Sequence, residues 1–189
     1  MNAISSRFTW ALLFLTTTLF VTQRPVAQVE QVEETIKRKN ELVADYILLG
    51  LFKQEKGELK EAKKNFTKAI ELDPTSAEAY THRGLLNFEQ GNHPEARQDL
   101  NKSLELLPNP PKDLLVSILS ASAPLELEGG DPDKAIARVS RLIELEPTLE
   151  IYLIRAKAYL QTGMLELAVD DLTEVSLLDE DNAEAYQLR

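Results

Sequence analysis

Residues 46–74 read YILLGLFKQEKGELKEAKKNFTKAIELDP, and the spacing within this stretch decides the fold. The i, i+3, i+4, i+7 pattern of one helical face is followed by Tyr46, Leu49, Gly50 and Lys53. Gly57 can adopt a positive φ and end this helix. Pro74 prevents a second helix from continuing, and the inner stripe of that helix is Ala62, Phe66, Ala69 and Ile70. The stretch therefore predicts two short helices joined by a glycine turn.

The same landmarks recur along the rest of the chain. The turn glycines are separated by 34, 39 and 33 residues, at Gly57, Gly91, Gly130 and Gly163. The same intervals separate the alanines that follow five residues later, Ala62, Ala96, Ala135 and Ala168. Prolines keep the first two intervals, at Pro74, Pro108 and Pro147. Because helices of about 12 residues are marginal alone, each pair must pack on the next. We therefore predict an all-α fold, an α-solenoid of stacked antiparallel helix pairs.

These landmarks resemble the tetratricopeptide repeat (TPR), whose pattern places aromatic, small and proline residues at fixed sites. The first repeat matches at Tyr46, Leu49, Gly50, Ala62, Phe66, Ala69 and Pro74. The second matches at Tyr80, Gly84, Ala96, Leu100 and Pro108, and the fourth at Tyr152, Ala156, Tyr159, Ala168 and Leu172. The resemblance implies a TPR superhelix with repeats at about 43–76, 77–110, 116–148 and 149–182. Residues 28–42 would form a capping helix or a linker, and residues 183–189 the start of an incomplete fifth repeat or a cap.

The third repeat departs most from the pattern. Its first helix, roughly Asp113–Glu128, contains Pro124 and has Leu119 at the aromatic position. Five extra residues precede this helix, around the segment LPNPPK. Because proline removes a helical hydrogen bond and crowds the preceding turn, we expect a kinked or shortened helix here.

The second and fourth repeats share a charge pattern. Each has an arginine where leucine is usual and an aspartate sixteen residues later, which gives the pairs Arg83 with Asp99 and Arg155 with Asp171. We predict a structural ion pair between the two helices of each of these repeats. The alternative is two exposed charges, and a surface pair usually adds less than about 1 kcal/mol.

In TPR arrays the first helices line a concave groove that binds a segment of a partner protein. The resemblance implies a partner-binding groove at Ile47, Leu51, Gln54, Thr81, Leu85, Phe88, Leu153, Lys157 and Leu160. This surface is mostly apolar, which suits an amphipathic helix or a hydrophobic strand of the partner. Ile47, Leu51 and Thr81 stand where the family's clamp for a C-terminal carboxylate has polar residues, so we do not expect that ligand. For each residue, packing between repeats is the alternative.

Composition narrows the function classes. The 189 residues include 31 acidic and 21 basic side chains, for a net charge of −10, so we expect no nucleic-acid partner. The chain has no cysteine, which excludes disulfides, thiolate metal sites and cysteine nucleophiles. His82 and His93 are its only histidines, and no third ligand recurs at a fitting spacing. We expect no catalytic residue, no metal, no cofactor and no enzyme activity.

The first 27 residues contain Arg7 and Arg24 but no acidic residue. Residues 8–21, FTWALLFLTTTLFV, form an apolar stretch of 14 residues, whereas a spanning helix needs about 20. With the small residue Ala27 at its end, this segment is typical of a secretory signal peptide. The alternative is an uncleaved anchor, with membrane association through residues 8–21. We therefore expect an exported protein, periplasmic or lumenal, or alternatively a membrane-anchored one.

Two functional hypotheses follow. The first is a protein–protein interaction scaffold that binds a partner peptide or helix in its groove outside the cytoplasm. The second is a membrane-anchored assembly factor for a membrane protein complex. A mature N-terminus at Gln28 would favour the first, and an intact Met1 in the membrane fraction would favour the second.

The C-terminal end offers little cover to the last full helix. After Asn182 only Ala183–Arg189 remain, which is less than two helical turns. The preceding helix carries apolar residues that need cover, namely Leu165, Ala168, Val169, Leu172 and Leu177. We expect a short cap with an exposed apolar flank, and a homodimer through this flank is a hypothesis. A partner that completes the array and a truncated product are the alternatives.

Overall fold

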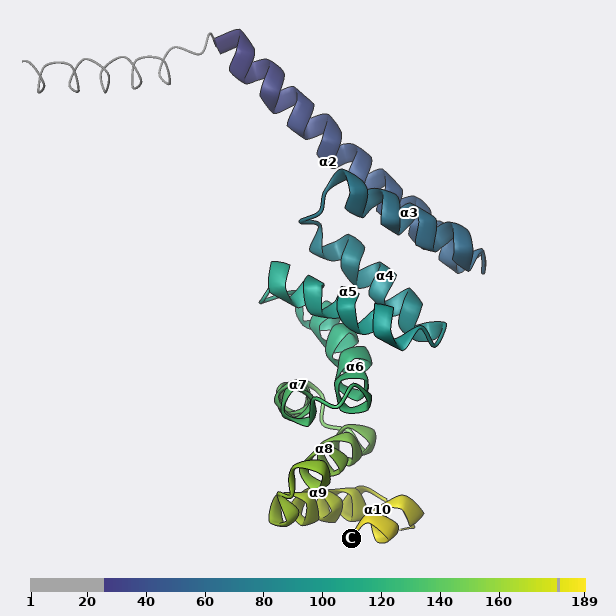
Figure 1. Cartoon of the computed structure of the whole chain (residues 1–189), viewed down its shortest axis with the longest axis vertical. Helices are drawn as coiled ribbons and strands as arrows, with labels where there is room; N and C mark the ends of the chain where they lie inside the picture. The colour runs from purple at the N-terminus through teal and green to yellow at the C-terminus, as the bar shows by residue number, and fades with distance from the viewer. Residues whose placement is uncertain (1–25, 180) are drawn as a thin grey trace, which may run out of the picture. The chain divides into compact units, whose positions relative to one another are not determined.

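A computed structural model describes residues 26–179 and 181–189, and every regular element in this part of the chain is an α-helix (Figure 1). The chain divides into two compact units, with the boundary between Leu42 and Val43. Helix α2, Val26–Glu55, runs through this boundary. In the first unit its residues Val29, Val32 and Ile36 are exposed. The capping helix or linker at 28–42 stays a prediction.

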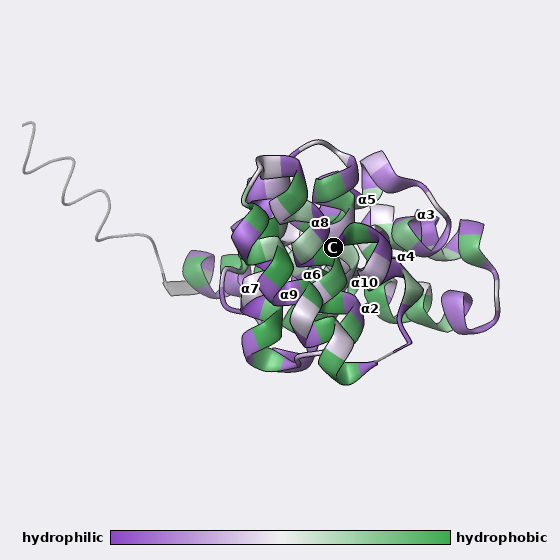
Figure 2. Cartoon of the chain, turned by 90° about the horizontal axis from the view of Figure 1, so that it is seen from below, coloured by the Kyte–Doolittle hydropathy of each residue, from purple (hydrophilic) through white to green (hydrophobic). Residues whose placement is uncertain are grey.

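The second unit is a stack of helices that follow one another in chain order (Figure 1). After α2 come α3 (Leu59–Leu72), α4 (Ala77–Glu89), α5 (His93–Leu106), α6 (Lys112–Glu128), α7 (Pro132–Leu145), α8 (Leu149–Thr162), α9 (Leu165–Leu178) and α10 (Ala183–Leu188). The helices pack as pairs, α4 on α5, α6 on α7 and α8 on α9, and each pair contacts the next. The predicted all-α solenoid of antiparallel helix pairs is confirmed. Hydrophobic and hydrophilic residues alternate in short bands along these helices (Figure 2).

The turn inside each pair has the same conformation. The glycines predicted to end the first helices have φ angles of 73°, 72°, 78° and 77°, at Gly57, Gly91, Gly130 and Gly163. The residue after each glycine donates its backbone N–H to the carbonyl five residues earlier, as Glu58 does to Lys53 at 2.9 Å. Only glycine adopts this left-handed conformation without strain, so the glycines set where each first helix ends.

The repeated phrase AEAY marks the start of two equivalent helices. The side chain of Ser76 accepts a hydrogen bond from the N–H of Ala79 at the start of α4. The side chain of Asn182 does the same for Ala185 at the start of α10. Both residues are N-caps, and a side-chain oxygen at this position satisfies one of the free N–H groups of the first turn.

The two helices of a pair approach each other closely where the first carries a small residue. Gly50 lies under the ring of Phe66, and a Cβ at Gly50 would overlap that ring. A Cβ at Gly84 would come within 2.9 Å of Leu100. In the third and fourth repeats alanine occupies this position. Ala123 lies in the cluster of Val139 and Ala156 in that of Leu172, and neither of these partners is larger than Leu100. The small residue therefore decides how near the helix axes lie.

The first helix of the third repeat differs from expectation. We predicted a kinked or shortened helix at Asp113–Glu128. The helix is not shortened, because α6 is a single helix of 17 residues, four longer than the 13 of α4, and the kink stays a prediction. Pro124 lies inside it, and Ser120, whose carbonyl loses its helical donor, is exposed. Water can take that hydrogen bond, so the helix continues. The extra residues before the repeat mostly extend α6 at its N-terminal end.

Helix α10 covers only part of α9. Ala185 is buried in a cluster with Leu172 and Val175, and Leu188 packs against it. Of the predicted flank, Ala168 and Leu172 are buried, whereas Leu165, Val169 and Leu177 are exposed, Leu177 by 72%. An exposed apolar flank is therefore present on α9, and the homodimer through it stays a hypothesis.

The segment at residues 8–21 lies outside the described residues, so the signal peptide or anchor stays a prediction. Among the residues that the structure does describe, no helix combines the length and the apolar character needed to cross a membrane.

We expect Phe66→Ala to destabilise the protein by about 3–5 kcal/mol, because it removes a fully buried ring and leaves a cavity against Gly50. Phe52→Ala is the matched control, since this ring is 48% exposed and its loss should cost less than about 1 kcal/mol. Urea unfolding of both variants, followed by circular dichroism, checks the difference. Equal destabilisation would show that the close helix contact does not hold the repeat together.

Candidate functional site

Three residues of the predicted groove belong to the core. Ile47 is 3% exposed, Thr81 0% and Leu153 7%. Ile47 packs with Val43 and Ala69, and Leu153 lies in the cluster around Leu172. The Thr81 hydroxyl donates to the carbonyl of Ala77 and lies 2.6 Å from that of Ser103 on α5. Neighbouring helices cover these three side chains, so they are not available to a partner.

The other six predicted groove residues remain partly accessible. Leu51, Leu85, Phe88 and Leu160 are half-buried. Gln54 donates to Glu89 Oε2 at 3.0 Å, and Lys157 Nζ lies 2.6 Å from Glu184 Oε1. The face is therefore a mixture of apolar side chains and paired polar groups. Its role as a binding groove stays a prediction.

An acidic side chain recurs on this face. Glutamates stand two residues before the first three turn glycines, at Glu55, Glu89 and Glu128, and all three are exposed. They keep the intervals of 34 and 39 residues that the glycines show. Each stands one helical turn after an apolar residue of the same face, Leu51, Leu85 or Pro124. Sequence reasoning missed this pattern, although the repeated interval was available to find it.

Ion pairs join the helices of the second and fourth repeats. Arg83 donates from Nε and Nη2 to the two carboxylate oxygens of Asp99, both at 2.8 Å. Its Nη1 also donates to Thr67 on α3, so it bridges two repeats. Hydrogen bonding to Asp99 raises the pKa of Arg83 above its ordinary value. Asp99 is buried, so this pair differs from the exposed alternative.

The fourth repeat has the same arrangement. Arg155 donates to Asp171 from Nε at 2.8 Å and from Nη2 at 2.6 Å, and its Nη1 reaches Ser140 on α7 at 3.2 Å. Its guanidinium also lies 5.6 Å from the ring of Tyr159. In both repeats the arginine connects its own pair to the second helix of the preceding one. These contacts are structural.

The third repeat carries a buried ion pair of opposite polarity. Glu126 on α6 is 1% exposed and its Oε1 lies 3.1 Å from Nη2 of Arg138 on α7. Arg138 also donates to Asn101 on α5. Burial lowers the pKa of Arg138 below its ordinary value. Two atoms of the pair, Glu126 Oε1 and Arg138 Nη1, have no hydrogen-bond partner within the described residues.

Sequence reasoning did not find the Glu126–Arg138 pair. Arg138 occupies the position of Asp99 and Asp171, three residues after Ala135, and we predicted ion pairs for the second and fourth repeats only. The missed signal was the acidic residue four positions before Gly130. In the third repeat the acidic residue lies on the first helix and the arginine on the second, which is the reverse of the other two pairs.

The two histidines contact different neighbours. His82 stacks on Phe66 with ring centroids 5.6 Å apart, and His93 Nδ1 lies 2.6 Å from Glu128 Oε2. Within the described ranges, no group of three or more histidine, aspartate or glutamate side chains is placed to hold a metal ion. Burial lowers the pKa of His82 below its ordinary value of 6.5, against the opposing effect of Glu78.

We expect Arg138→Met or Glu126→Leu alone to cost about 3–5 kcal/mol, because each leaves an unpaired charge in the core. The double variant should cost much less than the sum, since it removes both charges. A double-mutant cycle in urea measures this coupling. Additive single effects would mean that the two side chains do not compensate each other.

Stability should also depend on pH through His82. Its pKa is lower in the folded chain than in the unfolded chain, so the unfolded state binds the proton first as the pH falls. The contribution of neutral His82 to the free energy of unfolding is present above about pH 6.5, and it is lost as the pH falls through the pKa of His82 in the folded chain. We expect His82→Phe to lose less stability than the wild type between pH 7.5 and pH 5.5 in urea unfolding. An NMR titration midpoint of His82 above 6.5 would contradict this account.

The repeats match family models. Residues 54–91 match a model described as TPR repeat, and residues 77–110 and 121–185 match models described as tetratricopeptide repeat. No curated protein matches the chain.

Solved structures share the fold. YrrB, described as a TPR protein with an unusual peptide-binding site, is 23% identical, with 82% of this chain and 78% of that chain covered and a TM-score of 0.68. A MamA protein is 23% identical over 80% of this chain and 81% of that chain, with a TM-score of 0.58. MamA from Desulfovibrio magneticus RS-1 is 16% identical over 77% and 80%, with a TM-score of 0.62. The chain therefore contains tetratricopeptide repeats over residues 54–110 and 121–185, and its fold is that of a TPR solenoid.

Proposed function

We propose that the protein is an interaction scaffold whose first-helix face binds a helical segment of a partner protein. This face consists of the accessible side chains of α2 from Val43 onward, α4, α6 and α8. The segment that fits it carries an apolar stripe flanked by basic side chains. The observation that carries the proposal is the repeated placement of an exposed glutamate one turn after an apolar residue, as in Leu85 and Glu89.

The apolar part of the face suits an amphipathic helix. Leu51, Leu85, Phe88 and Leu160 are half-buried, so each leaves apolar surface that a partner can cover. Helix-in-groove binding uses such a stripe for affinity. The YrrB structure, with its peptide-binding site, supports the use of this fold for peptide recognition.

The acidic part of the face favours a basic partner. Glu55, Glu89 and Glu128 add three carboxylates along the first helices, and the whole chain carries a net charge of −10. Complementary charges accelerate association and exclude acidic segments. Glu128 is paired with His93 and Glu89 with Gln54, so Glu55 is the glutamate best placed for a new ion pair.

We further propose that this scaffold works outside the cytoplasm. The apolar stretch at residues 8–21, preceded by Arg7 and without acidic residues nearby, supports export. A membrane-anchored assembly factor is the second candidate, and the same stretch would then be its anchor. The mass of the protein isolated from its native cells separates the two, because export with cleavage removes the segment.

Two synthetic helical peptides test the groove. Both have the same leucine stripe over about five turns, and one has lysine flanks where the other has glutamate flanks. We expect the intact chain to bind the lysine peptide in fluorescence anisotropy. The double variant Glu55→Lys with Glu89→Lys should weaken this binding about tenfold or more, since two attractive contacts become repulsive.

The matched control reverses two exposed glutamates on second helices, Glu95→Lys with Glu144→Lys. It conserves the change in net charge, so it should leave binding nearly unchanged. Phe88→Glu tests the apolar part of the face, with circular dichroism to verify folding. Equal losses of affinity in both double variants would mean that the peptide responds to the net charge of the protein and not to this face. No loss in either variant would show that the peptide does not bind beside Glu55 and Glu89.

A further inference from the structure

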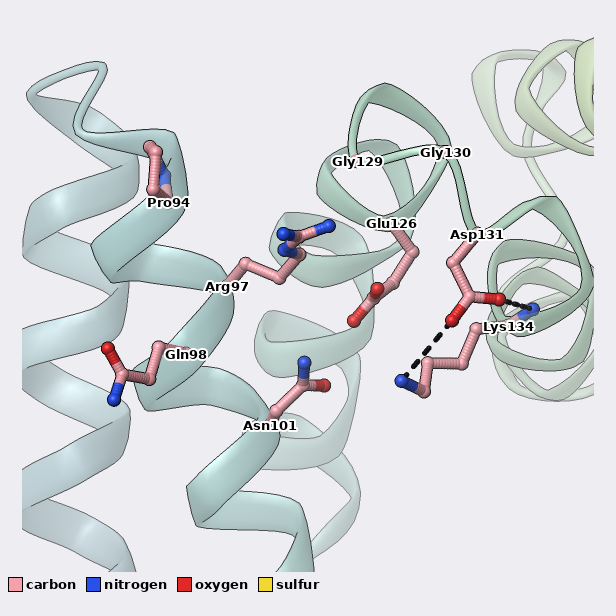
Figure 3. A pocket seen from close by; sticks show the side chains of 9 residues that line it. All are labelled: Pro94, Arg97, Gln98, Asn101, Glu126, Gly129, Gly130, Asp131 and Lys134. Atoms are coloured by element: carbon pink, nitrogen blue, oxygen red, sulfur yellow. Dashed lines mark hydrogen bonds and ion pairs between the residues drawn. The ribbon is translucent and has the colours of Figure 1, made fainter.

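A polar crevice lies between α5 and the junction of α6 with α7 (Figure 3). Its volume is about 670 Å³. A second pocket of about 150 Å³ adjoins it and shares Pro94, Arg97 and Gly129. Side chains from α5 form one wall of the crevice and the α6–α7 turn forms the other (Figure 3). The proposed function uses Glu128 of the adjoining pocket, but neither it nor the groove prediction uses a residue that lines the crevice itself.

The charges of the crevice are paired with one exception. Lys134 Nζ lies 3.4 Å from Asp131 Oδ2, and the carboxylate of Glu126 is paired with Arg138 behind the wall. In the adjoining pocket Glu128 Oε2 lies 2.6 Å from His93 Nδ1. Arg97 forms no ion pair or hydrogen bond with any residue in the described part of the chain. The crevice therefore carries one uncompensated positive charge in a protein that is strongly acidic.

Gly129 makes room for this arginine. A Cβ at Gly129 would overlap Nη1 of Arg97, so the guanidinium lies directly against the glycine. The φ of Gly129 is −74°, which any residue adopts. The backbone therefore does not require glycine at this position, and what the position supplies is space for the guanidinium. Figure 3 shows Arg97 reaching from α5 toward the α6–α7 turn.

The wall also contains a buried acceptor that is incompletely satisfied. Glu126 lines the crevice and is 1% exposed, and its Oε1 lies 3.1 Å from Arg138 Nη2 without receiving a well-aligned hydrogen bond from any described residue. A buried polar atom without a partner costs free energy, so such atoms are rare unless a ligand or water completes them. The amide side chains of Gln98 and Asn101 add further hydrogen-bonding groups beside it.

We propose that this crevice is a binding site for a carboxylate ligand that also carries an N–H group. Arg97 is the anchor, because its planar guanidinium binds a carboxylate through two parallel hydrogen bonds. The N–H of the ligand donates to Glu126. A single negative charge matches the one uncompensated positive charge of the site, whereas a phosphate dianion brings one negative charge more than Arg97 neutralises. An acidic residue within a peptide and a free acidic amino acid share this chemistry.

Calorimetric titration of the full chain tests the site. The probes are a blocked Ala-Glu-Ala peptide, free glutamate and the blocked Ala-Gln-Ala peptide. We expect at least one of the first two to bind and the glutamine peptide not to bind. Binding of the peptide alone assigns the site to a segment of a protein, and equal binding of free glutamate assigns it to small carboxylates. Equal binding of the glutamine peptide, or of none of the three, overturns the proposal.

Variants locate the binding in the crevice. Arg97→Gln removes the anchor and should weaken binding about tenfold or more. Gly129→Ala keeps all charges but displaces the guanidinium, so it should weaken binding as well. Arg141→Gln is the matched control, since this arginine lies on α7 outside both pockets and should leave affinity unchanged. If Gly129→Ala leaves both the affinity and the melting temperature unchanged, the assignment is overturned. Glu55→Lys changes the first-helix face, so it should leave the affinity of the crevice unchanged.

Discussion

The close contact between a small residue on each first helix and a large apolar residue on its second helix is the constraint on which the rest of the structure depends. Helices of 13 or 14 residues do not persist alone in water, so they must bury their stripes in pairs. Gly50 against Phe66 and Gly84 against Leu100 permit the nearest approach. The glycine turns then direct each second helix back along the first, and the next pair covers what remains exposed.

Polar contacts inside the stack fix how neighbouring helices are aligned with one another. Arg83 and Arg155 each connect their own second helix to that of the preceding repeat, through Asp99 with Thr67 and through Asp171 with Ser140. The third repeat meets the same need with the charges exchanged, and Arg138 reaches back to Asn101. A buried charge requires a partner in a defined place, so these pairs disfavour a shifted stacking of the repeats. They also bring Glu126 to the wall of the polar crevice.

The two proposed surfaces differ in how they arise. The first-helix face repeats because successive pairs present the same helical position to solvent, so a glutamate returns there in the first three repeats. The crevice differs, because among the described residues Arg97, Gly129 and Glu126 meet at a single junction, that of the second and third repeats. A repeated face suits an extended partner that spans several repeats, whereas a single crevice suits one charged group.

The sequence by itself determined the helix pairs, their glycine turns and the two arginine–aspartate contacts, because these depend on spacing within one repeat. It did not determine whether α6 would tolerate Pro124, nor that Ile47, Thr81 and Leu153 would be core residues. Helical periodicity tells which side of a helix is apolar, but only neighbouring helices decide which apolar residues are covered. The unpaired guanidinium of Arg97 and the buried Glu126–Arg138 pair were likewise decided by tertiary structure, since a side chain's partner depends on segments far apart in the chain.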